Sequence, residues 1–527
     1  MAALVCGYFI EIGWARRYNL MTRRMDLLGV ESKKMTTRRL STGIPGLDQV
    51  TMGGLIPRHA YVLVGNPGTG KTILSLQWLL EGVKCGEKGI FISMVEEPKM
   101  LKKNAESLGW DLAPIEITDF SVAAVGDMDE FEEYHVFPSS EVENAPVWKK
   151  ICEIVEKKKP QRLVIDSITQ LRQFSTDEYQ FRRHIFVLIR FLTQAGCTAV
   201  FSCEPLFMEE DTSISSAVDG IIYLEKEISR ERLIDIRNIH IQKFRGSDFL
   251  PGAHPMRITS RGVEIFPHII EKNREVQPAG EQIRSQIPEL DNLLGGGIES
   301  GTTTIISGPS GTGKSTLALQ FLMQAALAEK RAILYSFEET TESILFRSRS
   351  VGMEVMPLLE KGLLEIRYVN PLELYPDEFL QAIRLSIGKE SYNVAAFDSL
   401  NGYHMTMEEF GSTVAHLQNV ITYLKAQGTT VFMINETERI TGDLRMTEAG
   451  ISFLADNIIL LRYIEQMGRI GRVIGCVKKR LGAPQTELRE LILSSKGIQV
   501  GKKLDNFVGV LTGIPAIRDK WPEEHKE

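Results

Sequence analysis

Residues 43–72 read GIPGLDQVTMGGLIPRHAYVLVGNPGTGKT, and residues 286–315 read QIPELDNLLGGGIESGTTTIISGPSGTGKS. A proline, an aspartate and a lysine of the first stretch return 243 residues later in the second: Pro45 and Pro288, Asp48 and Asp291, Lys71 and Lys314. Further matched segments follow in the same order along both halves. We therefore interpret the chain as a duplicated domain.

The composition agrees with two folded domains. The chain has 527 residues, of which 43% are hydrophobic, so it is too long for one ordinary domain and can bury large cores. Its net charge of -7 gives no overall attraction to nucleic acid or to an anionic membrane. The six cysteines form no CxxC pair and no cluster at zinc-ligand spacing, which indicates reduced thiols. We expect a cytoplasmic protein.

Short apolar runs alternate with longer stretches of helical periodicity in each copy. Residues 182–194 are an example of the latter, with Phe186, Leu188, Ile189 and Leu192 expected on one side. Strands that alternate with helices imply parallel βαβ units. The predicted fold is α/β, with a mostly parallel sheet flanked by helices in each half.

The repeat also fixes the expected domain boundaries. We predict one domain over residues 38–267, a linker over 268–282 and a second domain over 283–512, followed by a short tail over 513–527. Residues 1–37 match neither copy, and their apolar stretch is too short to span a bilayer. We expect them to be a disordered extension or the product of a start codon placed too far upstream.

Both copies satisfy the pattern GxxxxGK[ST] between an apolar strand and a helical run, which is the context that a P-loop requires. Its glycines let backbone amides surround phosphates, and its lysine reaches the outer phosphates. The predicted ATP ligands are Gly65, Gly68, Thr69, Gly70, Lys71, Thr72 and Ile73, then Gly308, Gly311, Thr312, Gly313, Lys314, Ser315 and Thr316. The alternative, a glycine-rich turn that fits the pattern by chance, is weakened by the repetition.

Two aspartates complete a predicted Mg2+ site in each copy. Asp166 and Asp398 each end a hydrophobic strand and precede a serine. We predict that they hold the metal through water, on the strand beside the P-loop, together with the hydroxyls of Thr72 and Ser315. In isolation such an aspartate is as often a turn or helix cap.

A glutamate doublet follows the next strand in each copy: Glu96 and Glu97, then Glu338 and Glu339. A carboxylate at this place can orient or deprotonate a water opposite the γ-phosphate. Paired glutamates at a strand end are usually a solvated loop, but the doublet occurs in both copies. Either member of each doublet could be the base.

A basic pair stands near the end of each copy: Lys243 and Arg245, then Lys478 and Arg480. Residues two apart in a strand point to the same face, so each pair presents two cations on one side. One interpretation is a solvated strand face. The other is a set of fingers that act on the nucleotide of the next subunit, which requires a ring.

Over residues 38–512 the chain resembles the KaiC branch of RecA-like ATPases, the circadian-clock type of double-domain protein. The resemblance rests on the IPxLD stretch before each P-loop, the EE doublet, the DS strand end and the KxR pair, all present twice. It implies tandem RecA-like domains in a homohexameric double ring with ATP at the subunit interfaces. It also implies ATPase activity in the first ring and serine/threonine autokinase activity in the second.

The resemblance adds three site residues. Ser107, in the SLGW stretch, is counted with the nucleotide ligands, Ser452 takes the phosphoserine position, and Thr447 takes that of an accessory threonine. The neighbouring phosphothreonine position is occupied by Phe453, so a two-site phosphorylation cycle is not expected. Full clock function is therefore less expected than a KaiC-like ATPase that serves another signalling pathway through a partner protein.

Two other classes of function remain open at this point. A DNA-handling RecA or helicase relative is disfavoured by the acidic balance and the absence of a zinc module. A nucleotide-sensing scaffold would bind partners and turn over little ATP.

Overall fold

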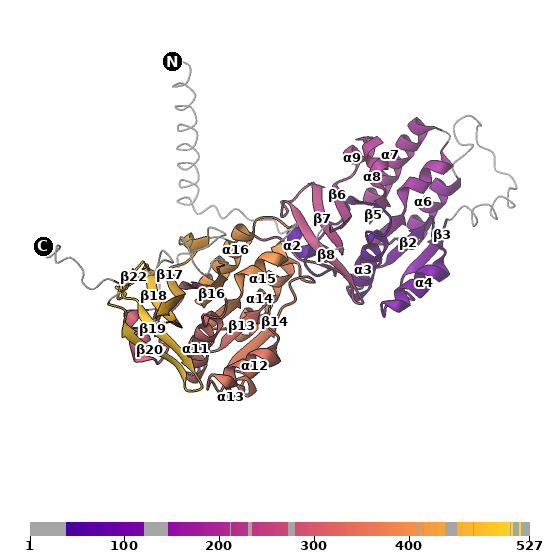
Figure 1. Ribbon diagram of the computed structural model, residues 1–527. Helices are drawn as coiled ribbons and strands as arrows, with labels where there is room; N and C mark the ends of the chain where they lie inside the picture. Colours follow the sequence, from indigo (N-terminus) through magenta and orange to yellow (C-terminus); the bar gives the residue numbers. More distant parts are fainter. Residues whose placement is uncertain are drawn as a thin grey trace, which may run out of the picture.

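The computed structural model describes residues 38–120, 146–175, 177–210, 212–229, 234–271, 280–407, 410–437, 451–466, 468–505, 507–509 and 516–517. They form two halves, each built on a nine-stranded sheet (Figure 1). The expected extension over residues 1–37 lies outside the described residues. None of the described helices is long and apolar enough to cross a membrane.

The first sheet has the strand order β3-β2-β4-β5-β1-β6-β7-β8-β9. Its six strands from β3 to β6 run parallel, and β7 to β9 continue antiparallel. The bounds are β1 Ala60–Gly65, β2 Gly89–Ser93, β3 Glu116–Asp119, β4 Arg162–Asp166, β5 Thr198–Cys203, β6 Gly220–Ile228, β7 Asp235–Phe244, β8 Ala253–Thr259 and β9 Gly262–Ile265. Every residue of β1, β2 and β5 is buried, as expected where helices cover both faces.

Helices cover both faces of this sheet. One core contains α2 Leu47–Val50, α3 Lys71–Lys84 and α4 Pro98–Ser107. The opposite core contains α6 Pro146–Lys158, the 3-10 helix η2 Ile168–Phe174, α7 Glu178–Gln194, α8 Pro205–Glu210 and α9 Thr212–Ala217. In α7 the buried residues include Ile185, Leu188, Ile189 and Leu192, whereas Phe186 is 45% exposed. Phe186 was assigned wrongly, because the buried face of α7 runs through Phe181, Ile185 and Leu188 and Phe186 does not lie on it.

The second sheet repeats the order as β14-β13-β15-β16-β12-β17-β18-β19-β20. Its strands are β12 Thr303–Gly308, β13 Ala332–Ser336, β14 Leu364–Tyr368, β15 Val394–Asp398, β16 Thr430–Glu436, β17 Asn457–Gln466, β18 Arg469–Lys479, β19 Arg489–Ser494 and β20 Gly497–Lys503. Two small pairs accompany it: β10 Gln282–Ile283 with β11 Ile298–Glu299, and β21 Phe507–Val508 with β22 Ala516–Ile517. The predicted fold class, two tandem mostly parallel sheets between helices, is confirmed.

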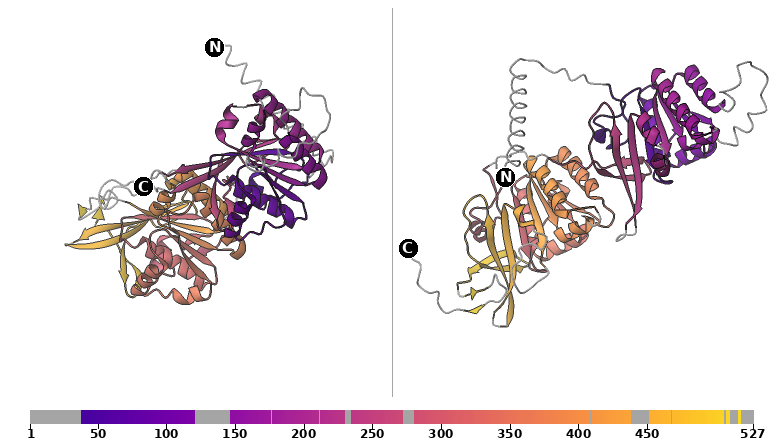
Figure 2. Two further views of the ribbon diagram at one scale, coloured as in Figure 1. Left: turned by 90° about the vertical axis from the view of Figure 1, so that its right-hand side faces the viewer. Right: turned by 90° about the horizontal axis from the view of Figure 1, so that it is seen from above.

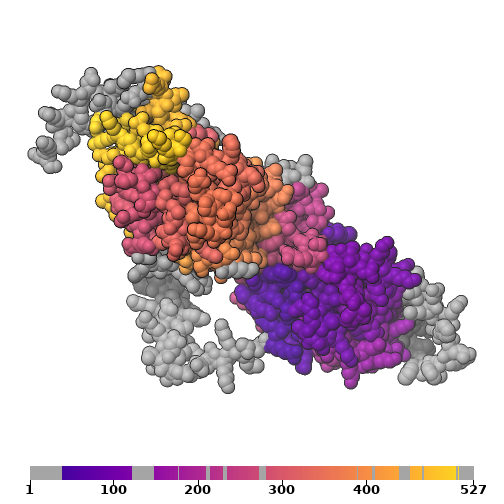
Figure 3. Space-filling view, turned by 90° about the horizontal axis from the view of Figure 1, so that it is seen from below, coloured from indigo at the N-terminus to yellow at the C-terminus, as the bar shows by residue number. Residues whose placement is uncertain are grey.

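The helices of the second half are also divided between the two faces. On one side lie α10 Pro288–Leu293, α11 Lys314–Leu327, α12 Thr341–Ser350 and α13 Met356–Glu360. On the other lie α14 Pro376–Glu390, α15 Leu400–Met407, α16 Thr413–Ala426 and the 3-10 turn η3 Ile451–Phe453. The two halves lie end to end and touch along one side of each (Figures 2 and 3).

Strand β8 joins the first half to the second. The Arg257 Nε lies 2.8 Å from an oxygen of Glu378 on α14, and the guanidinium carbon lies 4.3 Å from the ring centroid of Tyr375. The neighbours of Arg257 point the other way, as alternation in a strand requires. A Cβ built on Gly70 of the first P-loop would lie 2.8 Å from the Cδ1 of Ile258. One strand thus contacts the first P-loop on one face and the second half on the other.

A histidine cluster also lies where the halves meet, beside a cavity of about 660 Å³. His268 of the first half places its Nδ1 3.1 Å from a carboxylate oxygen of Asp377 on α14. This hydrogen bond raises the pKa of His268. His416 on α16 is buried and shares a hydrogen bond with the Tyr403 hydroxyl, and burial lowers the pKa of His416 to about 4.

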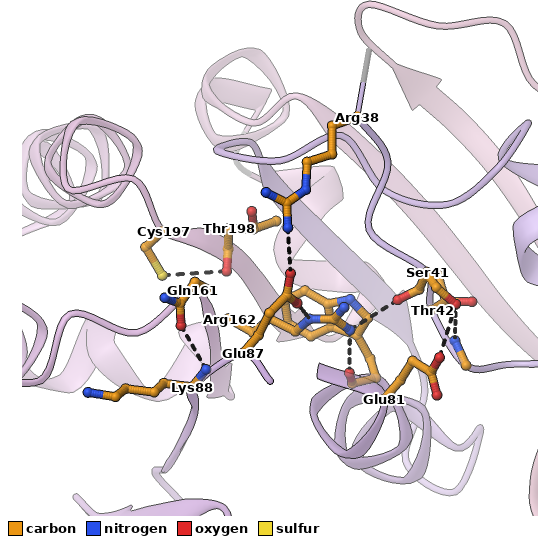
Figure 4. Close-up of polar contacts among 12 residues, drawn as sticks. Arg38, Ser41, Thr42, Glu81, Glu87, Lys88, Gln161, Arg162, Cys197 and Thr198 are labelled. Atoms are coloured by element: carbon orange, nitrogen blue, oxygen red, sulfur yellow. Dashed lines mark hydrogen bonds and ion pairs between the residues drawn. The ribbon is translucent and has the colours of Figure 1, made fainter. Parts of the chain in front are cut away.

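Arg162, the first residue of β4, anchors the core of the first half (Figure 4). It is 1% exposed, and its Nε lies 2.7 Å from an oxygen of Glu87. Its Nη1 donates to the carbonyl oxygens of Ser41 (3.0 Å) and Trp78 (2.6 Å). Val394, which is fully buried, stands at the matching start of β15. The same core position therefore holds a charged, hydrogen-bonded side chain in the first half and an apolar side chain in the second.

Candidate active site

The first P-loop connects β1 to α3. Gly68 and Gly70 have φ values of 78° and 104°, where a glycine avoids the steric cost that other residues meet. A Cβ on Gly65 would lie 2.7 Å from the Leu224 carbonyl oxygen, so this glycine permits close approach of the backbone to β6. The Lys71 Nζ donates to the Gly65 carbonyl oxygen at 2.6 Å. The Thr69 hydroxyl donates to another carbonyl of the same loop, at 2.9 Å.

The second P-loop repeats this geometry between β12 and α11. Gly311 and Gly313 have φ values of 75° and 102°. The Lys314 Nζ and the Thr312 hydroxyl both donate to the Pro309 carbonyl oxygen, each at 2.8 Å. Gly308, at the end of β12, has no room for a Cβ, which would lie 2.3 Å from the Leu461 carbonyl oxygen. Burial lowers the pKa of Lys314, as it does that of Lys71.

The predicted hydroxyl and carboxylate groups do meet. The Thr72 hydroxyl donates to Asp166 at 2.6 Å, and the Ser315 hydroxyl is hydrogen-bonded to Asp398. Burial raises the pKa of Asp398 to about 6, against the lowering effect of the Ser315 hydrogen bond. We had predicted that the aspartate strands lie beside the P-loop strands, and this was wrong: neither β4 nor β15 is adjacent to the P-loop strand of its half. Strands β5 and β16 intervene, because chain order does not fix spatial order in a sheet.

These oxygen donors fit Mg2+, which prefers one or two protein oxygens together with phosphate and water. Across the part of the chain that the structure describes, no three His, Cys, Asp or Glu side chains gather into a metal site of their own. A Mg2+ ion here would therefore be held by Thr72 and Asp166, or by Ser315 and Asp398, jointly with a nucleotide.

The glutamate doublets are offset by one residue between the copies. The Ser93 hydroxyl donates to the Glu96 carbonyl oxygen at 2.5 Å, and the Ser336 hydroxyl donates to that of Glu339 at 2.7 Å. Glu96 therefore corresponds to Glu339, with the spacing of 243 residues that relates the P-loops. The doublet therefore occurs in both copies, but its members do not occupy the same two positions of the repeat. Glu338 corresponds instead to Val95.

The members of the doublets also lie in different surroundings. Glu96 lines the cavity of the first P-loop, and burial, with Asp166 nearby, raises its pKa. Glu97 is the residue that precedes α4 and is absent from the cavity wall. In the second half, Glu338 and Glu339 both line the P-loop cavity. Glu338 accepts a hydrogen bond from the Ser399 hydroxyl.

Several residues that line the cavities were not predicted from the sequence, among them Glu204, Glu436 and Arg347. Glu204 and Glu436 follow or end the strand next to each P-loop strand, and the Lys314 Nζ lies 3.7 Å from Glu436. Their only sequence signal is a glutamate at the end of the strand that follows the aspartate strand in each copy. Arg347 on α12 also lines the second cavity.

Of three further predicted nucleotide ligands, two line a P-loop cavity and one does not. Ile73 and Thr316, at matching positions after the P-loop, line the two cavities. Ser107 ends α4, and its hydroxyl donates to the Asn104 carbonyl oxygen at 2.7 Å. Ser107 does not line the first cavity, so its role as a nucleotide ligand stays a prediction.

The basic pairs lie apart from the P-loop cavity of their own half. The Lys243 Nζ donates to the carbonyl oxygens of Ser215 and Val218, and the Arg245 Nη2 donates to that of Ser216. None of these residues lines the first cavity.

The second half repeats the arrangement. The Lys478 Nζ donates to the carbonyl oxygens of Ser452 (3.0 Å) and Ala455 (2.7 Å). The Arg480 Nη1 lies 3.0 Å from Asp456. Ser452 itself lies in η3, whereas Thr447 lies outside the described residues. The basic pair of the second half thus holds the segment that carries the candidate phosphoserine.

Two cavities, each combining a P-loop lysine, a hydroxyl–aspartate pair and a glutamate, are the geometry of a tandem nucleotide hydrolase. The family model described as "ATPase: KaiC" matches residues 40–269 and again residues 283–505. The chain belongs to the KaiC ATPase family. This membership supports nucleotide binding and ATPase activity for the chain, and it confirms the resemblance that the repeated motifs indicated.

Curated relatives of the KaiC family match nearly the whole chain. The circadian clock oscillator protein KaiC of Parasynechococcus marenigrum is 30% identical over 505 residues, which cover 92% of this chain and 94% of the relative. The protein of the same name from Synechococcus elongatus is 30% identical, with coverage of 92% and 93%. The circadian clock protein KaiC3 of Synechocystis sp. is 29% identical, with coverage of 90% and 94%.

Proposed function

We propose that this KaiC-family chain binds ATP with Mg2+ at both P-loops and hydrolyses it in both halves. The observation that carries the proposal is that each cavity brings together a lysine, a hydroxyl–aspartate pair and at least one glutamate. Both halves keep this set, so neither is a degenerate copy. A scaffold that only senses nucleotide would not need a carboxylate in both cavities.

The chemistry assigned to these residues is a displacement at the γ-phosphorus. A cavity carboxylate orients a water and accepts its proton, the water oxygen bonds to phosphorus, and the bond to the β–γ bridging oxygen breaks, which yields ADP and phosphate. Lys71 and Lys314 stabilise negative charge on the outer phosphate oxygens. Mg2+ would supply further charge stabilisation on the β- and γ-phosphates.

We place the chain in a homohexamer with nucleotide at subunit interfaces. The basic pairs support this arrangement, because Lys243 and Arg245 lie outside their own cavity and would reach the nucleotide of a neighbour. Ser452 likewise does not line the second cavity, so its phosphorylation would use ATP bound between subunits. The single Ser452 site, with Phe453 beside it, favours a signalling ATPase over a two-site clock cycle.

The test uses the full chain with Lys71→Ala, Lys314→Ala and both changes together. We expect each single variant to lose the ATPase activity of one half and the double variant to lose all of it. Solution mass with ATP and Mg2+ tests the hexamer, and mass spectrometry after incubation tests Ser452. A double variant that still hydrolyses ATP would refute the assigned sites, a monomer would refute the fingers, and unmodified Ser452 would refute the kinase. Stimulation by single-stranded DNA would favour the helicase alternative instead.

A further inference from the structure

Each cavity is lined by a glutamate at the same position of the repeat, Glu96 in the first half and Glu339 in the second. The side chain that contacts this glutamate differs between the halves. Asn104 on α4 and Arg347 on α12 occupy matching positions, again 243 residues apart. The Asn104 Nδ2 donates to Glu96 Oε1 at 2.7 Å. The Arg347 Nε lies 3.2 Å from Glu339 Oε2. A neutral amide in the first half is thus replaced by a cation in the second.

Arg347 is fixed in place by a second contact. Its Nη1 donates to the Thr316 hydroxyl at 3.3 Å, on the helix that begins with the P-loop lysine. Its side chain is 28% exposed, so solvent only partly screens its charge. The guanidinium therefore spans from Glu339 to the P-loop helix and lines the second cavity.

The amide of Asn104 and the guanidinium of Arg347 affect the neighbouring glutamate differently. An amide satisfies one oxygen of Glu96 but leaves its full negative charge available to a water. In the second half a guanidinium pairs with Glu339 and occupies the carboxylate oxygen that a water would otherwise contact. The second cavity holds another carboxylate, Glu338, which accepts from a serine hydroxyl rather than from a cation. The first half has Val95 at that position, so the doublet contributes only Glu96 to the first cavity.

We propose that Arg347 is a positioning residue that holds Glu339 in an ion pair and thereby makes Glu338 the water-activating carboxylate of the second site. In the first site Glu96 has this role. The inference rests on the proposed hydrolysis of ATP at both sites, and it predicts that the two sites use carboxylates at different positions of the repeat.

The test isolates the second site with Lys71→Ala in the full chain. In this background we expect Glu338→Gln to lower kcat at least ~100-fold, the range for loss of a general base, and Glu339→Gln to lower it only a few-fold. Adding Arg347→Asn frees Glu339, so the loss caused by Glu339→Gln should grow at least ~10-fold while the loss caused by Glu338→Gln shrinks. Arg347→Lys keeps the cation and should keep the original pattern.

Controls separate this inference from the proposed function. Arg349→Asn changes an exposed arginine of the same helix that does not line the cavity. Binding of a fluorescent ATP analogue to each variant verifies that the site still folds and binds. A Lys71→Ala protein that binds but never hydrolyses would refute hydrolysis at the second site. Equal losses for Glu338→Gln and Glu339→Gln, or losses that ignore Arg347→Asn, would refute only the role of Arg347.

The first site offers the reciprocal test, in a Lys314→Ala background. Asn104→Arg should lower kcat ~10-fold or more, because it pairs Glu96 with a cation and Val95 provides no other carboxylate. Adding Val95→Glu rebuilds the second-site arrangement and should restore much of the loss. If the double variant stays as slow as Asn104→Arg alone, the exchange of roles is refuted.

Discussion

Replacement of Arg162 by methionine tests how the first half is held together. The change removes the ion pair with Glu87 at 2.7 Å and the hydrogen bonds to the carbonyl oxygens of Ser41 and Trp78. It also removes the guanidinium from the Trp78 ring, whose centroid lies 5.1 Å away. Methionine keeps most of the length of the side chain, so the loss is mainly electrostatic.

The contacts set the expected magnitude. Breaking a buried ion pair costs about 3–5 kcal/mol, because the remaining charge stays buried without a partner. The Glu87 side chain keeps 11% exposure and a second cation, Arg38, at 3.6 Å, so we expect the lower end. A loss of about 3 kcal/mol corresponds to a fall of about 6–12 °C in the Tm of a domain of this size.

The assay is thermal unfolding of the full chain, combined with hydrogen exchange of peptides from each half, because two domains need not unfold together. The matched control is Arg38→Ala, since Arg38 reaches the same glutamate but is 81% exposed. Such exposed pairs contribute about 1 kcal/mol or less. Equal shifts for the two arginines, or exchange changes confined to the second half, would refute this reasoning.

Two more predictions concern packing and protonation. Gly82→Ala should destabilise the first half by about 1–3 kcal/mol, because its Cβ would lie 2.6 Å from the anchored Arg162 Cδ, although alanine usually favours a helix. Ala325→Gly at the matching position of the repeat gives the reference for helix propensity. A Gly82→Ala variant that is more stable than the original protein would contradict the prediction. The pKa of about 4 for buried His416 lies below its unfolded value, so its contribution to stability is complete above about pH 6.5 and falls by up to about 1.4 kcal/mol per pH unit towards pH 4. Urea unfolding against pH should show that slope weakened in His416→Gln but retained in His404→Gln, which changes an exposed histidine, and an unchanged slope in His416→Gln would rule out the assignment.

The repeat and its periodicity were enough to predict the fold and the meeting of Thr72 with Asp166. These are local consequences of a strand, a loop and a helix in fixed order. The interposed strand β5 was not predictable in the same way, because pairing in a parallel sheet is decided by packing between segments far apart in sequence.

The correspondence between the glutamates of the two copies was not predicted, for a different reason. Matching the two EE doublets by identity gives an offset of 242 residues, whereas the P-loop spacing of 243 residues and the hydrogen bonds of Ser93 and Ser336 pair Glu96 with Glu339. Arg347 escaped because a search for repeats looks for identity, whereas this position matters through its difference from Asn104. Sequence similarity thus located the cavities but could not assign roles within them.

Strand β8 connects the first P-loop with the second half of the chain. Ile258 lies against Gly70 of the first P-loop, while the adjacent Arg257 binds Glu378 on α14. If nucleotide in the first half displaces this strand, the contacts of Arg257 with the second half must change with it. Linkage is reciprocal, so any factor by which nucleotide in the first half alters affinity in the second must equal the factor in the opposite direction.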